Sequence, residues 1–177
     1  MKRPLKPKEI FIEANASCQL RCPTCPTTSK GYPPAVGSGH LSFADFQMLT
    51  DNNPQISSVV FDNRGEMFLN PDLLKIIEYG HFKKIKLSAP SGVNLNHVHA
   101  GVLEGLVKYG FREILCSIDG ATPEIYSRYR VGGDFITVIK HIKTINKYKA
   151  QYNSLFPQLR WQFVVFGHNE HELPQAR

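Results

Sequence analysis

The segment "EIFIEANASCQLRCPTC", residues 9–25, places a short run of β-forming residues directly before three closely spaced cysteines. Residues 9–14 combine branched and aromatic side chains, as half-buried strands do, and the polar Asn15 ends the run. The thiols follow at Cys18, Cys22 and Cys25, in a C-x3-C-x2-C spacing. A strand that leads straight into clustered reactive side chains predicts a functional site at one end of a β-sheet.

The chain of 177 residues has a globular composition, with 42% hydrophobic and 20% charged residues, and its length favours one domain over residues 1–177. It contains no apolar run of 18 residues and no signal-peptide pattern, so we expect a cytoplasmic protein without membrane association. The lysines and arginines behind the net charge of +6 are spread along the chain, so we expect no nucleic-acid partner. In a reducing compartment, clustered cysteines favour a metal site over disulfides.

Strand-like and helix-like segments alternate along the chain. The β-forming runs are residues 9–14, 57–62, 83–89, 112–119 and 159–166. The helical patterns between them are residues 42–52, 70–80, 94–110 and 134–151. Ser42 is the expected N-cap of the first helix, and Gly80 and Gly110 close the second and third. This order predicts an α/β fold of right-handed βαβ units with parallel strands and outer helices, either a partial (β/α) TIM-like barrel or an open doubly wound sheet.

In both arrangements, ligands bind where the carboxyl ends of the strands meet. The segments that follow the strands carry the polar and reactive residues. They are the cysteine loop, "NRGEMF" (63–68), "PSGVN" (90–94), "DGAT" (119–122) and "GHNEHE" (167–172). We therefore expect these five segments to converge on one rim of the sheet.

The three cysteines are one short of the four Cys or His ligands of a structural zinc site. His40 or Cys116 could in principle supply the fourth ligand. In a strand over "EILCSID" (113–119), however, Cys116 shares a face with the apolar residues, whereas Ser117 and Asp119 share the other. We therefore expect Cys116 to be a buried core residue and the polar pair to face the functional cavity.

Three thiolates without a fourth suit a [4Fe-4S] cluster better, because each cysteine binds one iron and one iron stays open to a non-protein ligand. The C-x3-C-x2-C spacing after a first strand, with prolines beside the cysteines, resembles the radical S-adenosylmethionine superfamily. The motifs "RGEMFLNPDL" (64–73), "CSIDG" (116–120) and "TPEIYSRYRVGGDF" (122–135) continue the resemblance, the last in the manner of members with SPASM or twitch extensions.

The resemblance implies that Cys18, Cys22 and Cys25 bind the cluster and serve catalysis. It implies that S-adenosylmethionine occupies the open iron and is cleaved to a 5′-deoxyadenosyl radical, which abstracts hydrogen from a peptide or small-molecule substrate. An external one-electron donor would reduce the cluster. The competing interpretation is a non-catalytic zinc-binding or scaffold domain that retains the fold.

The resemblance also implies contacts to S-adenosylmethionine from the second and third strands. Gly65 and Glu66 match the Gly-Gly-Glu-Pro motif of the family, whereas Arg64 and Met67 depart from it. Gly65 would allow close approach, and Glu66 would hold the methionine ammonium. Ser91 stands where many relatives have an asparagine, and would contact the ribose.

Further contacts are implied at the fourth and fifth strands. Ser117 and Asp119 would face the cofactor, and Arg130 would pair with its carboxylate, with Arg128 an equal competitor on spacing. The segment "RWQFVVFGHNEHEL" (160–173) resembles the strand-five motif that supplies Asn169, and Val165 or Phe166 would line the adenine.

The resemblance covers nearly the whole chain, from the first strand to just past the fifth. Members of the superfamily usually build a (β/α)6 partial barrel. We therefore expect a radical S-adenosylmethionine core domain whose barrel is truncated after strand five.

Overall fold

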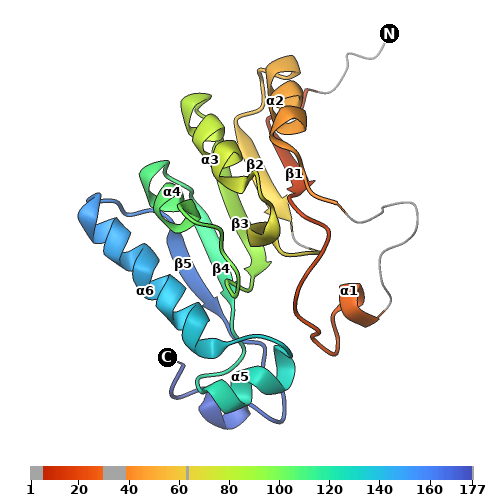
Figure 1. Ribbon diagram of the computed structural model, residues 1–177, viewed down its shortest axis with the longest axis vertical. Helices are drawn as coiled ribbons and strands as arrows, with labels where there is room; N and C mark the ends of the chain where they lie inside the picture. The colour runs from red at the N-terminus through yellow and green to blue at the C-terminus, as the bar shows by residue number, and fades with distance from the viewer. Residues whose placement is uncertain (1–5, 30–38, 63, 177) are drawn as a thin grey trace.

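The computed structural model describes residues 6–29, 39–62 and 64–176. Its centre is one sheet of five parallel strands in the order β1-β2-β3-β4-β5 (Figure 1). The strands are β1 (Glu9–Glu13), β2 (Ser58–Asp62), β3 (Lys86–Val93), β4 (Glu113–Ser117) and β5 (Gln158–Gln162). The α-helices are α1 (Pro26–Ser29), α2 (Phe43–Asn52), α3 (Leu73–Phe82), α4 (Val102–Lys108), α5 (Pro123–Tyr129) and α6 (Phe135–Gln151). Two 3-10 helices, η1 (Met67–Leu69) and η2 (Glu170–Glu172), follow β2 and β5.

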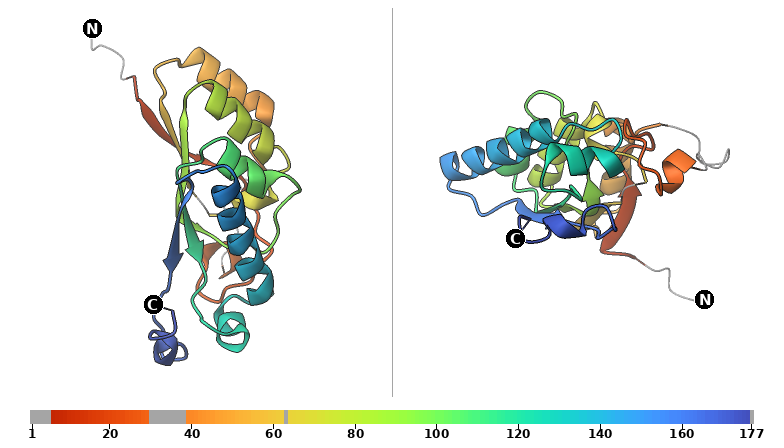
Figure 2. Two further views of the ribbon diagram at one scale, coloured as in Figure 1. Left: turned by 90° about the vertical axis from the view of Figure 1, so that its left-hand side faces the viewer. Right: turned by 90° about the horizontal axis from the view of Figure 1, so that it is seen from below.

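The strand order distinguishes between the two predicted arrangements. It follows the chain order, so right-handed crossovers place all connecting helices on the same face of the sheet. Figure 2 shows α2, α3, α4 and α6 on that face, and among the described residues no helix covers the other. A doubly wound sheet would need a reversal in strand order and helices on both faces. The α/β fold with parallel strands and outer helices is confirmed, in the form of a barrel-like arc.

Local sequence signals determine where several helices begin. The Ser42 hydroxyl accepts a hydrogen bond from the Asp45 backbone N–H at 3.1 Å, so α2 has the predicted N-cap. The Asp134 carboxylate caps α6 in the same way, through the Ile136 N–H at 2.9 Å. These caps satisfy backbone donors that have no partner within the helix.

Two predicted helices have different bounds in the structure. Gly80 does not close α3; it lies inside the helix, where an added Cβ would come within 2.8 Å of the Leu87 side chain. The third predicted helix, residues 94–110, is helical only from Val102, because Gly101 before it has a left-handed backbone with φ of +79°. Glycine at position 80 therefore serves helix-to-sheet packing rather than helix termination.

The prediction for the third strand was wrong at both ends. The residues from Lys83 to Ile85 form the turn after α3, with Lys84 at φ of +59°, so β3 starts at Lys86 rather than at residue 83. The strand continues through Val93 and pairs with β4 across a register shift between Ala89 and Val93. Most of "PSGVN" is therefore strand rather than a loop after the strand, and this irregular end carries Ser91 to the rim of the sheet.

The hydrophobic core lies between the sheet and the helix layer. The rings of Phe61 and Phe111 stack with centroids 6.2 Å apart, and Val138 and Ile145 of α6 are fully buried against the sheet. Full burial of such side chains contributes about 1.5–3 kcal/mol each. No helix in the described ranges combines the length and the hydropathy needed to cross a membrane. The carboxyl ends of the strands, where α1, α5 and η2 lie in Figure 1, are outside this core and can form a site.

Candidate functional site

A cavity of about 290 Å³ lies at the carboxyl ends of the strands. Its walls come from the loop after β1, the segment after β2, the ends of β3, β4 and β5, and the end of α5. The sequence-predicted residues that line it are Cys18, Cys22, Cys25, Gly65, Glu66, Ser91, Ser117 and Arg130. The fold thus brings most of the predicted site residues together. Asp119, Val165 and Asn169 do not line the cavity wall.

The three cysteines of the loop form no disulfide bonds and line the cavity together. Burial raises the pKa of the Cys18 thiol to about 11 and raises that of Cys22 above its usual value of 9.0. Two N–H groups approach these sulfurs. Asn94 Nδ2 lies 3.6 Å from Cys18 Sγ, and Arg130 Nη1 lies 3.8 Å from Cys22 Sγ. Both donors would stabilise the thiolate form that metal binding requires.

The cysteine loop is held against the segment after β2 through Gly65. A Cβ at this position would lie 2.1 Å from the Asn15 carbonyl oxygen and 2.7 Å from that of Ser17. The Glu66 N–H donates to the Ser17 carbonyl at 2.8 Å, and Asn15 Nδ2 donates to the Glu66 carbonyl at 3.1 Å. Gly65 therefore allows the cysteine loop itself to approach closely, which is a structural role in addition to the ligand contact predicted from the sequence.

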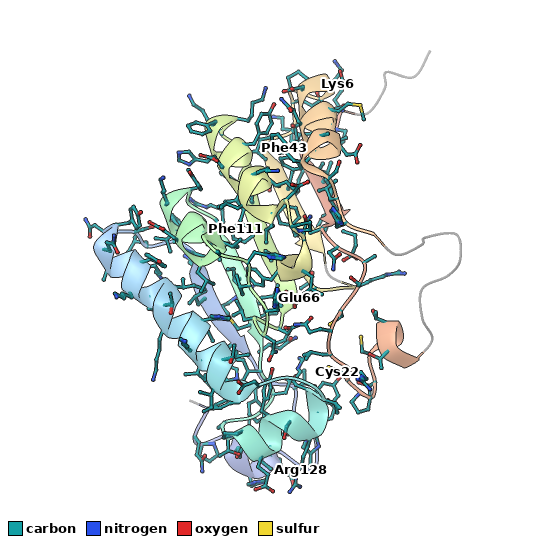
Figure 3. All side chains as sticks on the ribbon, viewed as in Figure 1. Lys6, Cys22, Phe43, Glu66, Phe111 and Arg128 are labelled. Carbon is teal, nitrogen blue, oxygen red and sulfur yellow. The ribbon has the colours of Figure 1, made fainter. Side chains whose placement is uncertain are left out.

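Glu66 is almost completely buried, and its carboxylate is engaged with two backbone amides. Oε1 accepts from the Phe68 N–H at 3.2 Å, and Oε2 accepts from the Asn94 N–H at 2.6 Å. Burial raises the pKa of Glu66 to about 7, although these hydrogen bonds oppose the shift. The carboxylate links η1 to the end of β3 and contributes to the cavity wall at the same time (Figure 3).

The two arginines that compete on spacing are separated by the fold. Arg128 lies on the outer side of α5, half exposed, and pairs with Glu124 at 2.6 Å (Figure 3). Arg130 lines the cavity and forms an ion pair with Asp119, whose side chain is fully buried. Of these two residues, the structure places only Arg130 at the site.

Asp119 was expected to face the cavity with Ser117, and its position differs from that expectation. β4 ends at Ser117, so the alternation of a strand does not extend to Asp119, whose backbone is left-handed with φ of +57°. Its carboxylate lies behind Arg130 and accepts from the Val164 N–H at 2.7 Å. Asp119 therefore supports the cavity wall from behind.

The residues after β5 also differ from expectation. Val165 is half exposed and lies outside the cavity, whereas its neighbour Val164 lines it. Asn169 is fully buried, and its side chain accepts from the Phe166 N–H and donates to the carbonyls of Asp119 and Val164. Asn169 therefore shapes the loop that follows β5. Phe166 packs its ring against Tyr129, with centroids 4.5 Å apart.

Cys116 has the position that strand parity predicts. It is buried on the helix side of the sheet with Ile114 and Ile118, and burial raises the pKa of its thiol to about 12. It lines a separate small cavity beside Ile142 and Asn146 of α6. Cys116 is thus a core residue and does not line the cavity with the other three thiols.

Asn94 and Gln162 are polar residues of the cavity wall that sequence reasoning missed. Asn94 connects Cys18 to the neighbouring Gln19, whose Nε2 donates to Asn94 Oδ1 at 2.9 Å. Gln162 accepts a hydrogen bond from the Ser117 hydroxyl at 2.9 Å. Gln162 could have been found from register, because it pairs with Ser117 across β4 and β5. No sequence signal distinguishes Asn94, since its contacts depend on the irregular end of β3.

Among the described residues, no group of three or more His, Cys, Asp or Glu side chains is close enough to share one metal ion. The ligands of a single ion converge on one point, whereas each cysteine of an iron–sulfur cube binds a different iron. The spread of the three thiols around one cavity is therefore compatible with a cube.

Comparisons with known proteins find this architecture in solved structures but find no relative by sequence. No protein-family model matches the chain, and no curated protein matches it significantly in sequence. The SuiB protein of Streptococcus suis, in a crystal structure bound to S-adenosylmethionine, matches with a TM-score of 0.71 at 17% identity, over 96% of this chain and 37% of SuiB. Another SuiB structure holds the precursor peptide SuiA and matches with a TM-score of 0.70 at 17% identity, over 96% of this chain and 36% of SuiB.

BtrN, in complex with AdoMet and 2-DOIA, matches with a TM-score of 0.57 at 14% identity, over 91% of this chain and 57% of BtrN. SuiB and BtrN are radical S-adenosylmethionine enzymes. This chain shares their fold. At these identities the likeness concerns the fold alone, and the chain spans little more than a third of the length of SuiB.

Proposed function

We propose that residues 1–177 form the core domain of a radical S-adenosylmethionine enzyme. The observation that carries the proposal is the cavity in which Cys18, Cys22 and Cys25 meet residues from the ends of four further strands. SuiB and BtrN, which share this fold, were solved with S-adenosylmethionine bound. When bound, a [4Fe-4S] cluster would supply the electron that cleaves S-adenosylmethionine to a 5′-deoxyadenosyl radical for hydrogen abstraction.

The donor set of the cavity suits such a cluster. Three thiols face one space, and N–H groups of Asn94 and Arg130 approach two of the sulfurs. Hydrogen bonds of this kind are typical of the surroundings of iron–sulfur clusters. The three thiols would hold the cluster, and the neighbouring polar wall would hold S-adenosylmethionine.

The chain offers specific groups for S-adenosylmethionine. Arg130 Nε is buried without a hydrogen-bond partner among the described residues, so it has an N–H available for the carboxylate of a ligand. The Ser117 hydroxyl and the exposed Ser91 also line the cavity and offer hydrogen bonds to a ribose. Gly65 and Glu66 complete the wall next to the cysteine loop.

The substrate would be a peptide or a small molecule. A peptide agrees with the complex of SuiB with SuiA, whereas the BtrN complex contains the small molecule 2-DOIA. An external one-electron donor would reduce the cluster. The chain spans only part of the length of SuiB and BtrN. We therefore propose substrate contacts only for residues that line the described cavity.

Anaerobic reconstitution with iron and sulfide tests the proposal. We expect about four irons per chain, a broad charge-transfer absorbance, and 5′-deoxyadenosine after addition of S-adenosylmethionine and dithionite. Cys22→Ala should lose the iron, whereas Cys116→Ala, which removes a core thiol, should retain it. Stoichiometric zinc with no iron and no 5′-deoxyadenosine would contradict the proposal and favour a zinc-binding or scaffold domain.

A further inference from the structure

The guanidinium of Arg130 contacts two different groups, the carboxylate of Asp119 and the sulfur of Cys22. Nη2 forms the ion pair with the Asp119 carboxylate, while Nη1 approaches Cys22 Sγ at 3.8 Å. A planar guanidinium presents its N–H groups in fixed directions, so one arginine can satisfy a carboxylate and a sulfur at the same time. The position of the N–H at Cys22 therefore depends on how firmly Asp119 is held.

Asp119 is held from several sides. Its side chain is fully buried, and Oδ1 accepts from the Val164 N–H at 2.7 Å. Its backbone carbonyl accepts from Asn169 Nδ2 at 3.0 Å, which ties it to the loop after β5. Both contacts come from the segment after β5, and they fix Asp119 and, through the ion pair, the guanidinium of Arg130.

Resting on the proposed function, we propose that Arg130 donates a hydrogen bond to the sulfur of the cluster ligand Cys22 and thereby raises the reduction potential of the cluster, with Asp119 as its positioning residue. Reduction adds negative charge to the cluster and its ligand sulfurs. A cationic donor at a sulfur stabilises this reduced form more than the oxidised form. The potential of a cluster depends on such hydrogen bonds and on the charges around it.

Asn94 provides an internal comparison. Its amide approaches Cys18 Sγ at 3.6 Å but carries no charge, and its oxygen accepts hydrogen bonds from Gln19 and Asn96. A neutral donor stabilises added negative charge less than a cationic one. The two cluster ligands therefore have different electrostatic surroundings, and removal of Arg130 should have the larger effect.

A redox titration of the reconstituted chain, followed by absorbance and by EPR of the reduced cluster, tests the inference. At a fixed potential, Arg130→Met should lower the ratio of reduced to oxidised cluster about tenfold, equivalent to about 59 mV for a one-electron couple. Arg128→Met is the matched control, since Arg128 lies in the last turn of α5, two residues before Arg130, and pairs with the exposed Glu124. It should leave the ratio unchanged. An Arg130→Met chain with a full cluster and an unchanged potential would overturn the inference.

If the methionine variant does not fold or does not bind iron, Arg130→Lys tests the same inference. Lysine retains the charge next to Asp119, but one ammonium on a flexible stem does not reproduce the fork that reaches both Asp119 and Cys22. Its potential should shift in the same direction by a smaller amount, and an unchanged potential would refute the role of the N–H. Failure of the unaltered chain to bind iron would instead refute the proposed function, so the two failures are distinguishable.

Discussion

Replacement of Gly65 by alanine should destabilise the protein by displacing the cysteine loop. The added Cβ would lie 2.1 Å from the Asn15 oxygen, 2.6 Å from the Ala16 carbonyl carbon and 2.7 Å from the Ser17 oxygen. All three are backbone atoms, so no side-chain rotation relieves the overlap. The loop and the segment after β2 must separate by about 1 Å to restore van der Waals distances.

The cost follows from the contacts that this separation breaks. Overpacking of a well-packed site costs about 1–3 kcal/mol. The hydrogen bonds from the Glu66 N–H to Ser17 and from Asn15 to the Glu66 carbonyl would be lost, at about 0.5–1.5 kcal/mol each. The sum is about 2–6 kcal/mol, which corresponds to a fall in melting temperature of about 4–24 °C for a domain of this size.

Circular dichroism melts of the metal-free chain under reducing conditions would measure this effect. Gly167→Ala is the matched control, because a Cβ there would meet nothing within 4 Å. After reconstitution, Gly65→Ala should also bind less iron than the control, since the loop that carries the thiols is displaced. A Gly65→Ala chain that melts within about 2 °C of the unaltered protein would show that the two segments can separate freely, and the reasoning would be wrong.

Two further predictions concern buried charges. The pKa of Glu66 is about 7 in the folded chain against a usual 4.5, so the folded state binds more protons than the unfolded state between these values, and the free energy of unfolding should fall as the pH rises through this window. Urea unfolding at several pH values should show that slope, and Glu66→Gln should flatten it; an equal slope in both proteins would exclude Glu66 as its source. Asp119→Asn leaves the charge of Arg130 buried without its partner and should cost about 3–5 kcal/mol in urea unfolding. Glu124→Gln, which breaks the exposed pair with Arg128, should leave the midpoint nearly unchanged, and equal losses in the two variants would contradict the difference in burial.

The sheet could be predicted because its signals are local. Runs of branched and aromatic residues identified all five strands, and helix caps such as Ser42 and Asp134 are encoded within a few residues. The bounds of β3 and α4 could not be predicted in the same way. They depend on left-handed backbone at Lys84 and Gly101 and on pairing of the irregular β3 end with β4, which periodicity does not report.

The sequence also predicted part of the candidate site, namely the residues that lie within regular strands. Strand alternation placed Ser117 and Cys116 on opposite faces, and the structure agrees, because both lie within β4. The same rule failed two residues later at Asp119, where the strand has ended. Spacing alone could not distinguish Arg130 from Arg128, since the choice depends on which side of α5 and its C-terminus faces the cavity.

The sequence by itself determined the alternation of strands and helices, the spacing of the three thiols and the burial of Cys116, because each follows from residue type and local periodicity. Only the tertiary structure decided that Gly65 packs on the cysteine loop and that Asp119 holds Arg130 next to Cys22. These contacts join residues that lie far apart in the chain. Their geometry arises when the ends of neighbouring parallel strands are brought together at one edge of the sheet.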